Sequence, residues 1–208
     1  MHIVHPAVDK YLYAQLPKSD PILAEMERYA KKHDVPIVGP AVGRLLFQLV
    51  QLIGAKRIFE LGSAIGYSTL WMARAAGSDA EIYYTDGDPA NAERARGYFE
   101  RAGVTNRIRI GTGDALELLR RTPGKFDLIF NDVDKEGYPD VFQQAVPRVR
   151  SGGLFITDNT LWSGRVVKKA TQATTRAIQK FNKLAYASEE LFPVLVPLRD
   201  GVLVCRKK

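Results

Sequence analysis

The sequence predicts an α/β fold, a doubly wound and mostly parallel seven-stranded sheet with an antiparallel C-terminal hairpin strand and extra N-terminal helices. Short apolar runs alternate with amphipathic helical segments from residue 56 onwards, and two last apolar runs flank a short turn. Only helical periodicity precedes residue 56. With 208 residues, one domain is expected over 1–208, with N-terminal helices in 1–55 and the core in 56–208.

The N-terminal portion is predicted to be helical. Asp20 is a capping residue and Pro21 suits the first helical position, so a helix is expected to begin there. A second helix is expected over residues 40–53, because its apolar residues recur at helical spacing on one face.

The core is predicted from its alternating pattern. The apolar runs expected to form strands are 57–61, 81–85, 107–110, 126–131 and 154–157. The segments expected to form helices between and after them are 67–76, 89–102, 115–120, 138–146 and 174–187. Strands that alternate with helices form parallel sheets covered on both faces, so a Rossmann-like core is expected.

The last two apolar runs, 193–198 and 201–206, are joined by the turn-like residues Arg199, Asp200 and Gly201. So short a connection favours an antiparallel hairpin. The sheet is therefore expected to end in an antiparallel pair at one edge.

Composition excludes several classes of protein. The single Cys205 allows no internal disulfide and no multi-cysteine zinc site. No apolar run approaches the length of a membrane span, and the N-terminus shows no signal-peptide pattern, so no membrane association and a cytoplasmic location are expected.

The formal charge of +7 is concentrated near the C-terminal end, and residues 163–183 contain no acid. This basic segment is either a solvated surface or a positive rim for an anionic substrate or RNA.

A glycine-bounded turn follows the first predicted strand. Gly62 and Gly66 let the backbone turn sharply and approach a ligand, and the next helix offers free N–H groups at its start. The spacing differs from the GxGxxG pattern of dinucleotide-binding folds, and no lysine follows the second glycine as in a P-loop. A nucleotide-type ligand without a bound pyrophosphate is therefore expected.

Acidic residues follow the second and third predicted strands. Asp86 lies 24 residues after Gly62, near the spacing of a carboxylate that binds ribose hydroxyls. Asp88 resembles a helix cap before Pro89, and Asp114 is either a cap or a contact for an adenine ring. Ligands of open α/β sheets bind at such strand ends.

Oxygen ligands follow two further predicted strands. Asp132, Asp158 and Asn159 together suit a hard cation, with Mg²⁺ expected first and Mn²⁺ or Ca²⁺ as alternatives. The other interpretation is that these side chains cap helices or turns. Lys135 is a candidate proton acceptor if a cation and partial burial lower its pKa, and a surface lysine otherwise.

At these residues the chain resembles the class I S-adenosylmethionine-dependent O-methyltransferases. It is most similar to the cation-dependent branch that includes catechol and caffeoyl-CoA O-methyltransferases and small bacterial relatives. The most specific match pairs Asp-x-x-Lys at 132–135 with Asp-Asn-x-Leu-Trp-Ser-Gly at 158–164, and the glycine turn at 59–69 matches the wider class.

The resemblance implies roles for individual residues. Those implied for S-adenosylmethionine are Val38, Gly39, Glu60, Gly62, Gly66, Ser68, Asp86, Asp114, Ala115 and Asp132. Those implied for a divalent cation are Asp132, Asp158 and Asn159. Lys135 and Asp132 are the implied catalytic residues. A homodimer is also implied.

The expected reaction is cation-dependent methyl transfer to a hydroxyl of a small catechol-like phenol or a phenolic acyl-CoA ester. The alternative within enzymes is O-methylation of a hydroxyuridine in tRNA, which the basic segment would suit. A non-catalytic S-adenosylmethionine-binding protein is an alternative of another class, and the missing GxGxxG pattern disfavours an NAD-dependent oxidoreductase.

Overall fold

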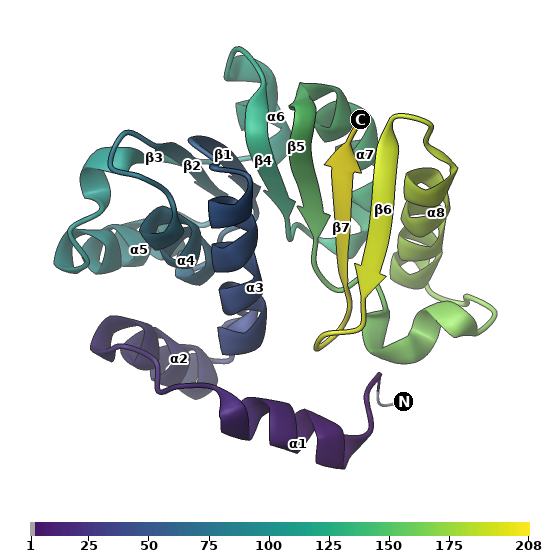
Figure 1. Cartoon of the computed structure of the whole chain (residues 1–208), viewed down its shortest axis with the longest axis horizontal. Coiled ribbons are helices and arrows are strands. Elements are labelled where there is room, and N and C mark those ends of the chain that lie inside the picture. Colours follow the sequence, from purple (N-terminus) through teal and green to yellow (C-terminus); the bar gives the residue numbers. More distant parts are fainter. Residues whose placement is uncertain (1–2) are drawn as a thin grey trace.

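The computed structural model describes residues 3–208, and residues 1 and 2 lie outside the described part. Its strands form one seven-stranded sheet in the order β3-β2-β1-β4-β5-β7-β6 (Figure 1). The strands are β1 (Arg57–Leu61), β2 (Glu81–Asp86), β3 (Ile108–Thr112), β4 (Phe126–Asn131), β5 (Val149–Thr157), β6 (Leu191–Val196) and β7 (Val202–Lys207). β1 to β5 are parallel, and β7 is antiparallel to both of its neighbours, which confirms the predicted sheet.

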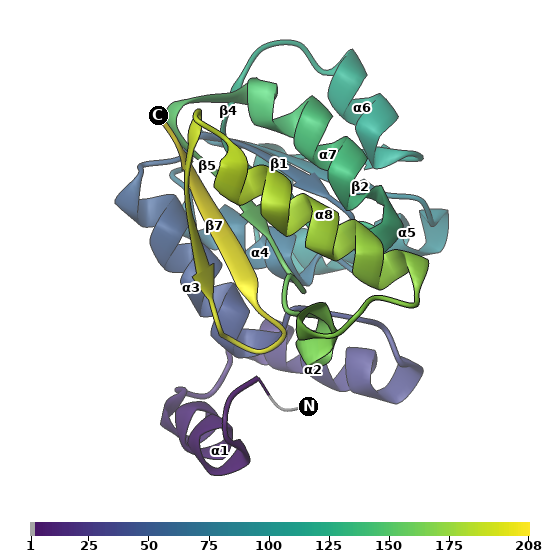
Figure 2. The same cartoon turned by 90° about the vertical axis from the view of Figure 1, so that its right-hand side faces the viewer.

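Helices flank the sheet and extend beyond its edge (Figure 2). The α-helices are α1 (Pro6–Gln15), α2 (Pro21–His33), α3 (Gly39–Leu52), α4 (Tyr67–Ala75), α5 (Pro89–Arg101), α6 (Ala115–Arg121), α7 (Tyr138–Ala145) and α8 (Ala173–Ala187). Short 3₁₀ segments are η1 (Thr105–Arg107), η2 (Lys135–Gly137), η3 (Val146–Arg148) and η4 (Trp162–Val167). No helix among residues 3–208 is both long and apolar enough to cross a bilayer.

The core has two layers because successive strand residues point to opposite faces of the sheet. In β1, Ile58 packs in the cluster formed with α2 to α5, whereas Phe59 and Leu61 pack in the cluster formed with α6 to α8. Phe181 of α8 is the aromatic centre of the second cluster. Its ring lies 5.3 Å from that of Tyr138 and 6.1 Å from that of Phe155.

Two elements differ from the sequence-based prediction. β5 begins at Val149, five residues before the predicted start at 154, because the strand continues through Gly152 and Gly153, which the apolar run leaves out. A Cβ on Gly153 would lie 2.7 Å from the carbonyl oxygen of Asp127, so only glycine lets β5 pass this close to β4. The boundaries of α1 were not predicted, and this helix buries none of its residues against the rest of the chain.

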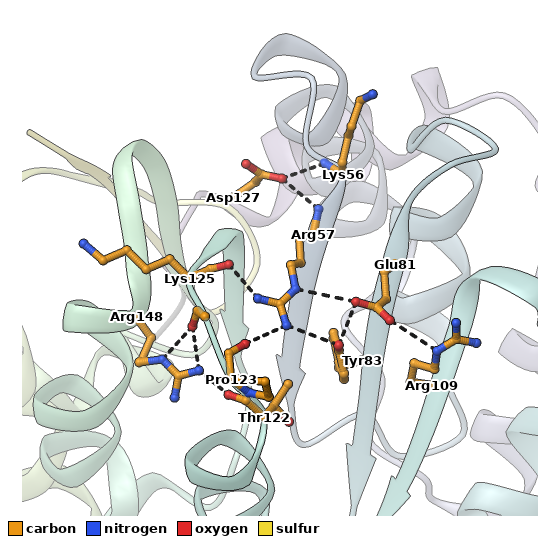
Figure 3. Close-up of polar contacts among 11 residues, drawn as sticks. Lys56, Arg57, Glu81, Tyr83, Arg109, Thr122, Pro123, Lys125, Asp127 and Arg148 are labelled. Atoms are coloured by element: carbon orange, nitrogen blue, oxygen red, sulfur yellow. Dashed lines mark hydrogen bonds and ion pairs between the residues drawn. The ribbon is translucent and has the colours of Figure 1, made fainter.

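Charged side chains tie together the amino ends of the central strands (Figure 3). Arg57 donates hydrogen bonds to the carbonyl oxygens of Pro123 and Lys125, at 2.7 and 3.0 Å. The carboxylate of Asp127 accepts hydrogen bonds from the backbone N–H groups of Lys56 and Arg57, at 2.8 and 2.7 Å. This network fixes the strands at the edge opposite the candidate site.

Backbone hydrogen bonds continue beyond the strands at their carboxyl ends. They run from Ser63 to Thr85, from Gly113 to Asp86, from Asp132 to Leu61 and from Asp158 to Asn131, with N–O distances of 2.8–3.1 Å. The loops after β1 to β5 are therefore held side by side along one edge. Figure 1 shows this edge facing α1 and α2.

The packing predicts the stability cost of truncating one buried phenylalanine. Phe181→Ala should lower the free energy of unfolding by about 3–5 kcal/mol, because the side chain is fully buried and its loss leaves a cavity. Phe192→Ala on edge strand β6 is the matched control, since that side chain is 64% exposed. It should change stability by less than about 0.5 kcal/mol in urea-unfolding experiments. Equal costs for the two variants would contradict the assigned core.

Candidate active site at the carboxyl edge of the sheet

A cavity of 1140 Å³ opens at the carboxyl edge of the sheet. It is lined by the loops that follow β1 to β5, by residues 34–37 before α3 and by Arg199 in the turn before β7. The predicted site residues on its wall are Gly62, Asp86, Asp114, Ala115, Asp132, Lys135 and Asn159. The structure thus brings together most of the residues that the sequence singles out.

The turn after β1 depends on Gly62. Its φ of +80° is favourable only for glycine, and a Cβ at this position would lie 2.7 Å from the carbonyl oxygen of Asp132. The turn is also held by Asp86, whose Oδ2 accepts a hydrogen bond from the backbone N–H of Ala64 at 2.8 Å. The acid that follows β2 therefore fixes the turn that follows β1.

Glu60 lies beneath this turn and is completely buried. Its carboxylate accepts hydrogen bonds from the hydroxyls of Ser68 and Thr69. Burial raises the pKa of Glu60 to about 7, although both hydrogen bonds lower it. In the described structure neither Glu60 nor Ser68 lines the cavity, so both support the turn from below.

Other residues implied for the cofactor also lie behind the cavity wall. A Cβ on Gly66 would lie 2.5 Å from the ring of Phe99, so Gly66 allows close packing of the turn against α5. Val38 is 2% exposed, and neither it nor Gly39 is on the wall. Residues 34–37, immediately before them, form that part of the wall instead.

The three acids after β2 and β3 differ in their bonding. Asp88 caps α5 through a 2.8 Å hydrogen bond from the backbone N–H of Ala90, as predicted. Asp114 caps α6 through a 2.7 Å bond from the N–H of Glu117, and it lines the cavity as well. Asp86 caps no helix, and its Oδ1 accepts a bond from the side chain of Asn91 at 3.1 Å.

Two carboxylates lie at the ends of β4 and β5, and each is paired with a cation. Lys135 Nζ is 2.8 Å from Asp132 Oδ1, and Arg199 Nη1 is 2.9 Å from Asp158 Oδ2. The Asp158 side chain is 0% exposed and that of Asp132 is 21% exposed. Ion pairs in such surroundings are screened much less than those on a surface.

The environment of these carboxylates opposes their ionisation. Burial and the charge of Asp132 together raise the pKa of Asp158 to about 7, against the lowering effect of Arg199. Burial likewise raises the pKa of Asp132, against the lowering effect of Lys135. Asp158 Oδ1 is buried and has no hydrogen-bond partner among the described residues. A buried acceptor left unpaired is costly, so this oxygen is suited to an external partner.

The segment after Asp158 also lines the cavity, through Asn159 and Trp162. Asn159 has a φ of +56°, a left-handed conformation that asparagine tolerates better than most residues. Trp162 lines the cavity, and the guanidinium of Arg165 lies 5.0 Å from its ring centroid. The site therefore has an aromatic wall beside its polar groups.

Arg199 is a site residue that sequence reasoning missed. The sequence assigned it only to the turn of the C-terminal hairpin. The direction of the strands could have identified it. β7 is antiparallel to both β5 and β6, so β6 runs in the same direction as β5. The turn that follows β6 must therefore lie at the carboxyl edge of the sheet. That topology places residues 199–201 beside the acids that follow β4 and β5.

The predicted ligands for a cation are all oxygen donors. Among residues 3–208, no group of three or more His, Cys, Asp and Glu side chains is arranged to hold a metal ion. The predicted set of Asp132, Asp158 and Asn159 contains two carboxylates and one amide. These are hard oxygen donors of the kind that Mg²⁺ accepts together with water.

Comparison with known proteins gives consistent results. A family model described as O-methyltransferase matches residues 14–208. A catechol O-methyltransferase of Niastella koreensis is 34% identical over 89% of this chain and 87% of its own length. Caffeoyl-CoA O-methyltransferase 1 of Zea mays is 31% identical over 96% of this chain and 82% of its own length. The structure of an O-methyltransferase from Bacillus cereus in complex with SAH has a TM-score of 0.88 and 30% identity, covering 97% of each chain.

The burial of Glu60 predicts a pH-dependent contribution to stability. Because its pKa is about 7 in the fold and 4.5 ordinarily, the folded state binds the proton more tightly. The stabilising effect is complete below pH 4.5 and is lost as the pH rises through 7. Relative to the always neutral Glu60→Gln variant, the wild type should lose about 3 kcal/mol of unfolding free energy over this range. Urea unfolding at several pH values measures it, and a difference that stays constant with pH would contradict it.

Proposed function

Since this chain belongs to the O-methyltransferase family, we propose that it methylates a hydroxyl oxygen of a small catechol-like phenol or a phenolic acyl-CoA ester with the help of a divalent cation. It is an S-adenosylmethionine-dependent enzyme, as the family match and the SAH-bound relative indicate. The observation that carries the proposed acceptor and cation is the pair of carboxylates at the ends of β4 and β5. Asp132 lines the cavity that Gly62 and Asp86 also border, and Asp158 is buried behind Arg199, which lines the same cavity.

We propose that S-adenosylmethionine lies along the loops after β1, β2 and β3. Gly62 lets the backbone come close to the ligand, and Asp86 accepts hydrogen bonds from the ribose hydroxyls. Asp114 and Ala115 would flank the adenine ring from the start of α6. Glu60 and Ser68 would contribute through the shape of the turn, because they bond each other beneath it.

The residues present fit a divalent cation. Asp158 Oδ1 is a buried carboxylate oxygen without a partner, which supports a role for it as a ligand together with Asp132 and Asn159. When bound there, a divalent cation would supply Lewis-acid stabilisation of a substrate oxyanion. The relatives named for catechol and caffeoyl-CoA support an acceptor with a hydroxyl on an aromatic ring.

The chain's own residues would position the acceptor and accept its proton. Lys135 Nζ lies 2.8 Å from Asp132 and 5.4 Å from the ring centroid of Tyr138. It is the proposed acceptor of the hydroxyl proton, and it would accept that proton as the neutral amine after releasing its own proton to solvent. Trp162 would pack against the aromatic ring of the substrate. Fixing the oxygen and the methyl group in line is the largest expected contribution to rate.

Transfer RNA remains the alternative acceptor because of one observation. α8 carries a groove of 430 Å³ lined by Arg176, Lys180 and Lys183 together with apolar residues. α8 begins beside the cavity, since Thr174 lies on the cavity wall. Activity on small catechols but not on tRNA would remove this alternative, whereas tRNA affinity that falls steeply with salt would support it.

We further propose that the enzyme is a homodimer, as the resemblance implies. The helix α1 supports this, because Val8, Tyr11 and Leu12 on it are exposed apolar side chains. Such a patch is the kind of surface that subunits cover.

Replacing Asp158 tests the proposed cation. Asp158→Ala should lower turnover by at least about 100-fold, because it removes a proposed ligand, and should leave S-adenosylmethionine affinity within about threefold. Turnover is measured with catechol and labelled cofactor, and affinity by calorimetry. Excess chelator should abolish wild-type turnover and Mg²⁺ should restore it. Full turnover in excess chelator would exclude the cation from the reaction.

Comparing two nearby acids tests the proposed cofactor site. Asp86→Ala should weaken S-adenosylmethionine binding about 10- to 100-fold, because a charged acceptor for ribose hydroxyls is lost. Asp88→Ala is the matched control, since Asp88 also lines the cavity but caps α5. It should cost about 1 kcal/mol of stability with little change in affinity. Equal losses of affinity would show that Asp86 has no specific contact with the cofactor.

A further inference from the structure

We propose that Arg199 is a built-in competitor of the divalent cation, because its guanidinium occupies the Asp158 carboxylate that the cation needs. This inference rests on the proposed cation-dependent function. It makes Arg199 a residue that sets cation affinity, and it predicts that removing the guanidinium strengthens cation binding.

The contacts of Arg199 fix its guanidinium at the carboxylate pair. Nη1 donates to Asp158 Oδ2 at 2.9 Å, and Nη2 donates to the carbonyl oxygen of Ile37 at 2.9 Å. The side chain is 34% exposed and lines the cavity, so it lies between solvent and the buried Asp158. A cation that approaches Asp158 from the cavity therefore meets this guanidinium.

The turn that carries Arg199 is fastened to the segment after Asp158. The backbone N–H of Leu161 donates to Asp200 O at 2.9 Å, and that of Thr160 donates to Gly201 O at 3.0 Å. The Arg199 backbone itself has a φ of +52°, a left-handed conformation that suits glycine best. The position of residue 199 is thus set by the backbone around it, independently of its side chain.

The charge balance of the site disfavours a further cation. Lys135 and Arg199 each form an ion pair with one of the carboxylates Asp132 and Asp158, so both acids already have a positively charged partner. A divalent ion would therefore add uncompensated positive charge, and repulsion between charges is strong where little water screens them. Asp134 and Glu136 also line the cavity but are exposed, so water weakens their effect.

Arg199 leaves only part of Asp158 available. Oδ2 is bonded to the guanidinium, whereas Oδ1 has no hydrogen-bond partner within residues 3–208. Binding through both oxygens requires Arg199 to withdraw, and withdrawal also breaks its bond to Ile37 on the cavity wall. Cation binding through both oxygens and the contact between residues 37 and 199 are therefore opposed, and each weakens the other by the same factor.

The test measures Mn²⁺ binding alone, by calorimetry on the full chain without S-adenosylmethionine or acceptor. Arg199→Gly should bind Mn²⁺ at least about 10-fold more tightly than the wild type. Glycine suits the backbone at this position, so the variant should fold. Lys168→Gln is the matched control, because it removes one positive charge from an exposed site. It should change the affinity by less than about threefold.

Two more variants separate charge from structure. Arg199→Lys keeps the positive charge and should stay within about threefold of the wild-type affinity. Asp158→Ala should abolish Mn²⁺ binding in both the wild-type and the Arg199→Gly background. Circular dichroism and S-adenosylmethionine affinity verify that each variant is folded.

The outcomes distinguish this inference from the proposed function. If the wild type binds Mn²⁺ through Asp158 but Arg199→Gly binds no more tightly, Arg199 is no competitor and the proposed function stands. An Arg199→Lys affinity as high as that of Arg199→Gly would also overturn competition by charge. If no variant binds Mn²⁺, the inference fails together with the cation in the proposed function, and undiminished turnover in chelator would show the latter independently.

Discussion

The parallel pairing of β4 with β5 brings Asp132 and Asp158 side by side, because each follows the last residue of its strand and those residues are register partners. Two carboxylates so near each other in a poorly hydrated place repel one another. The chain offsets this repulsion with Lys135 and Arg199, each of which forms an ion pair with one of the two carboxylates. Tyr138 adds a hydrogen bond to the Asp158 carbonyl oxygen at 2.8 Å. The two carboxylates are therefore held in place by ion pairs and a hydrogen bond within the chain.

The side chains at the amino edge of the sheet join neighbouring strands, whereas those at the carboxyl edge line a cavity. At the amino ends, Arg57 and Asp127 join neighbouring strands through bonds that involve backbone groups. At the carboxyl ends, backbone bonds hold the loops together and leave side chains such as Asp86 and Lys135 directed at a cavity. A ligand can thus be bound without any rearrangement of the strands, in keeping with the general placement of sites in open α/β sheets.

The sequence was sufficient for the sheet and for seven residues of the cavity wall, because hydrophobic periodicity and strand-end acids are local signals. It failed where the outcome depends on contacts between distant segments. β5 starts at Val149 because Gly153 passes close to Asp127, and no local pattern reports that approach. Glu60 is an acid at the end of a strand, as a ligand-binding residue would be, but its side chain lies under the turn and accepts a hydrogen bond from Ser68. Arg199 joins the site only through the direction of the C-terminal hairpin.

The hairpin turn before β7 has an evolutionary consequence. Its backbone is anchored by Thr160 and Leu161, so the residue at 199 can be exchanged with little disturbance to the strands on either side. A single codon change there alters the charge beside Asp158 while the scaffold persists. Under the proposed competition, an exchange at this one position would change cation affinity while the loops after β4 and β5 keep their backbone contacts.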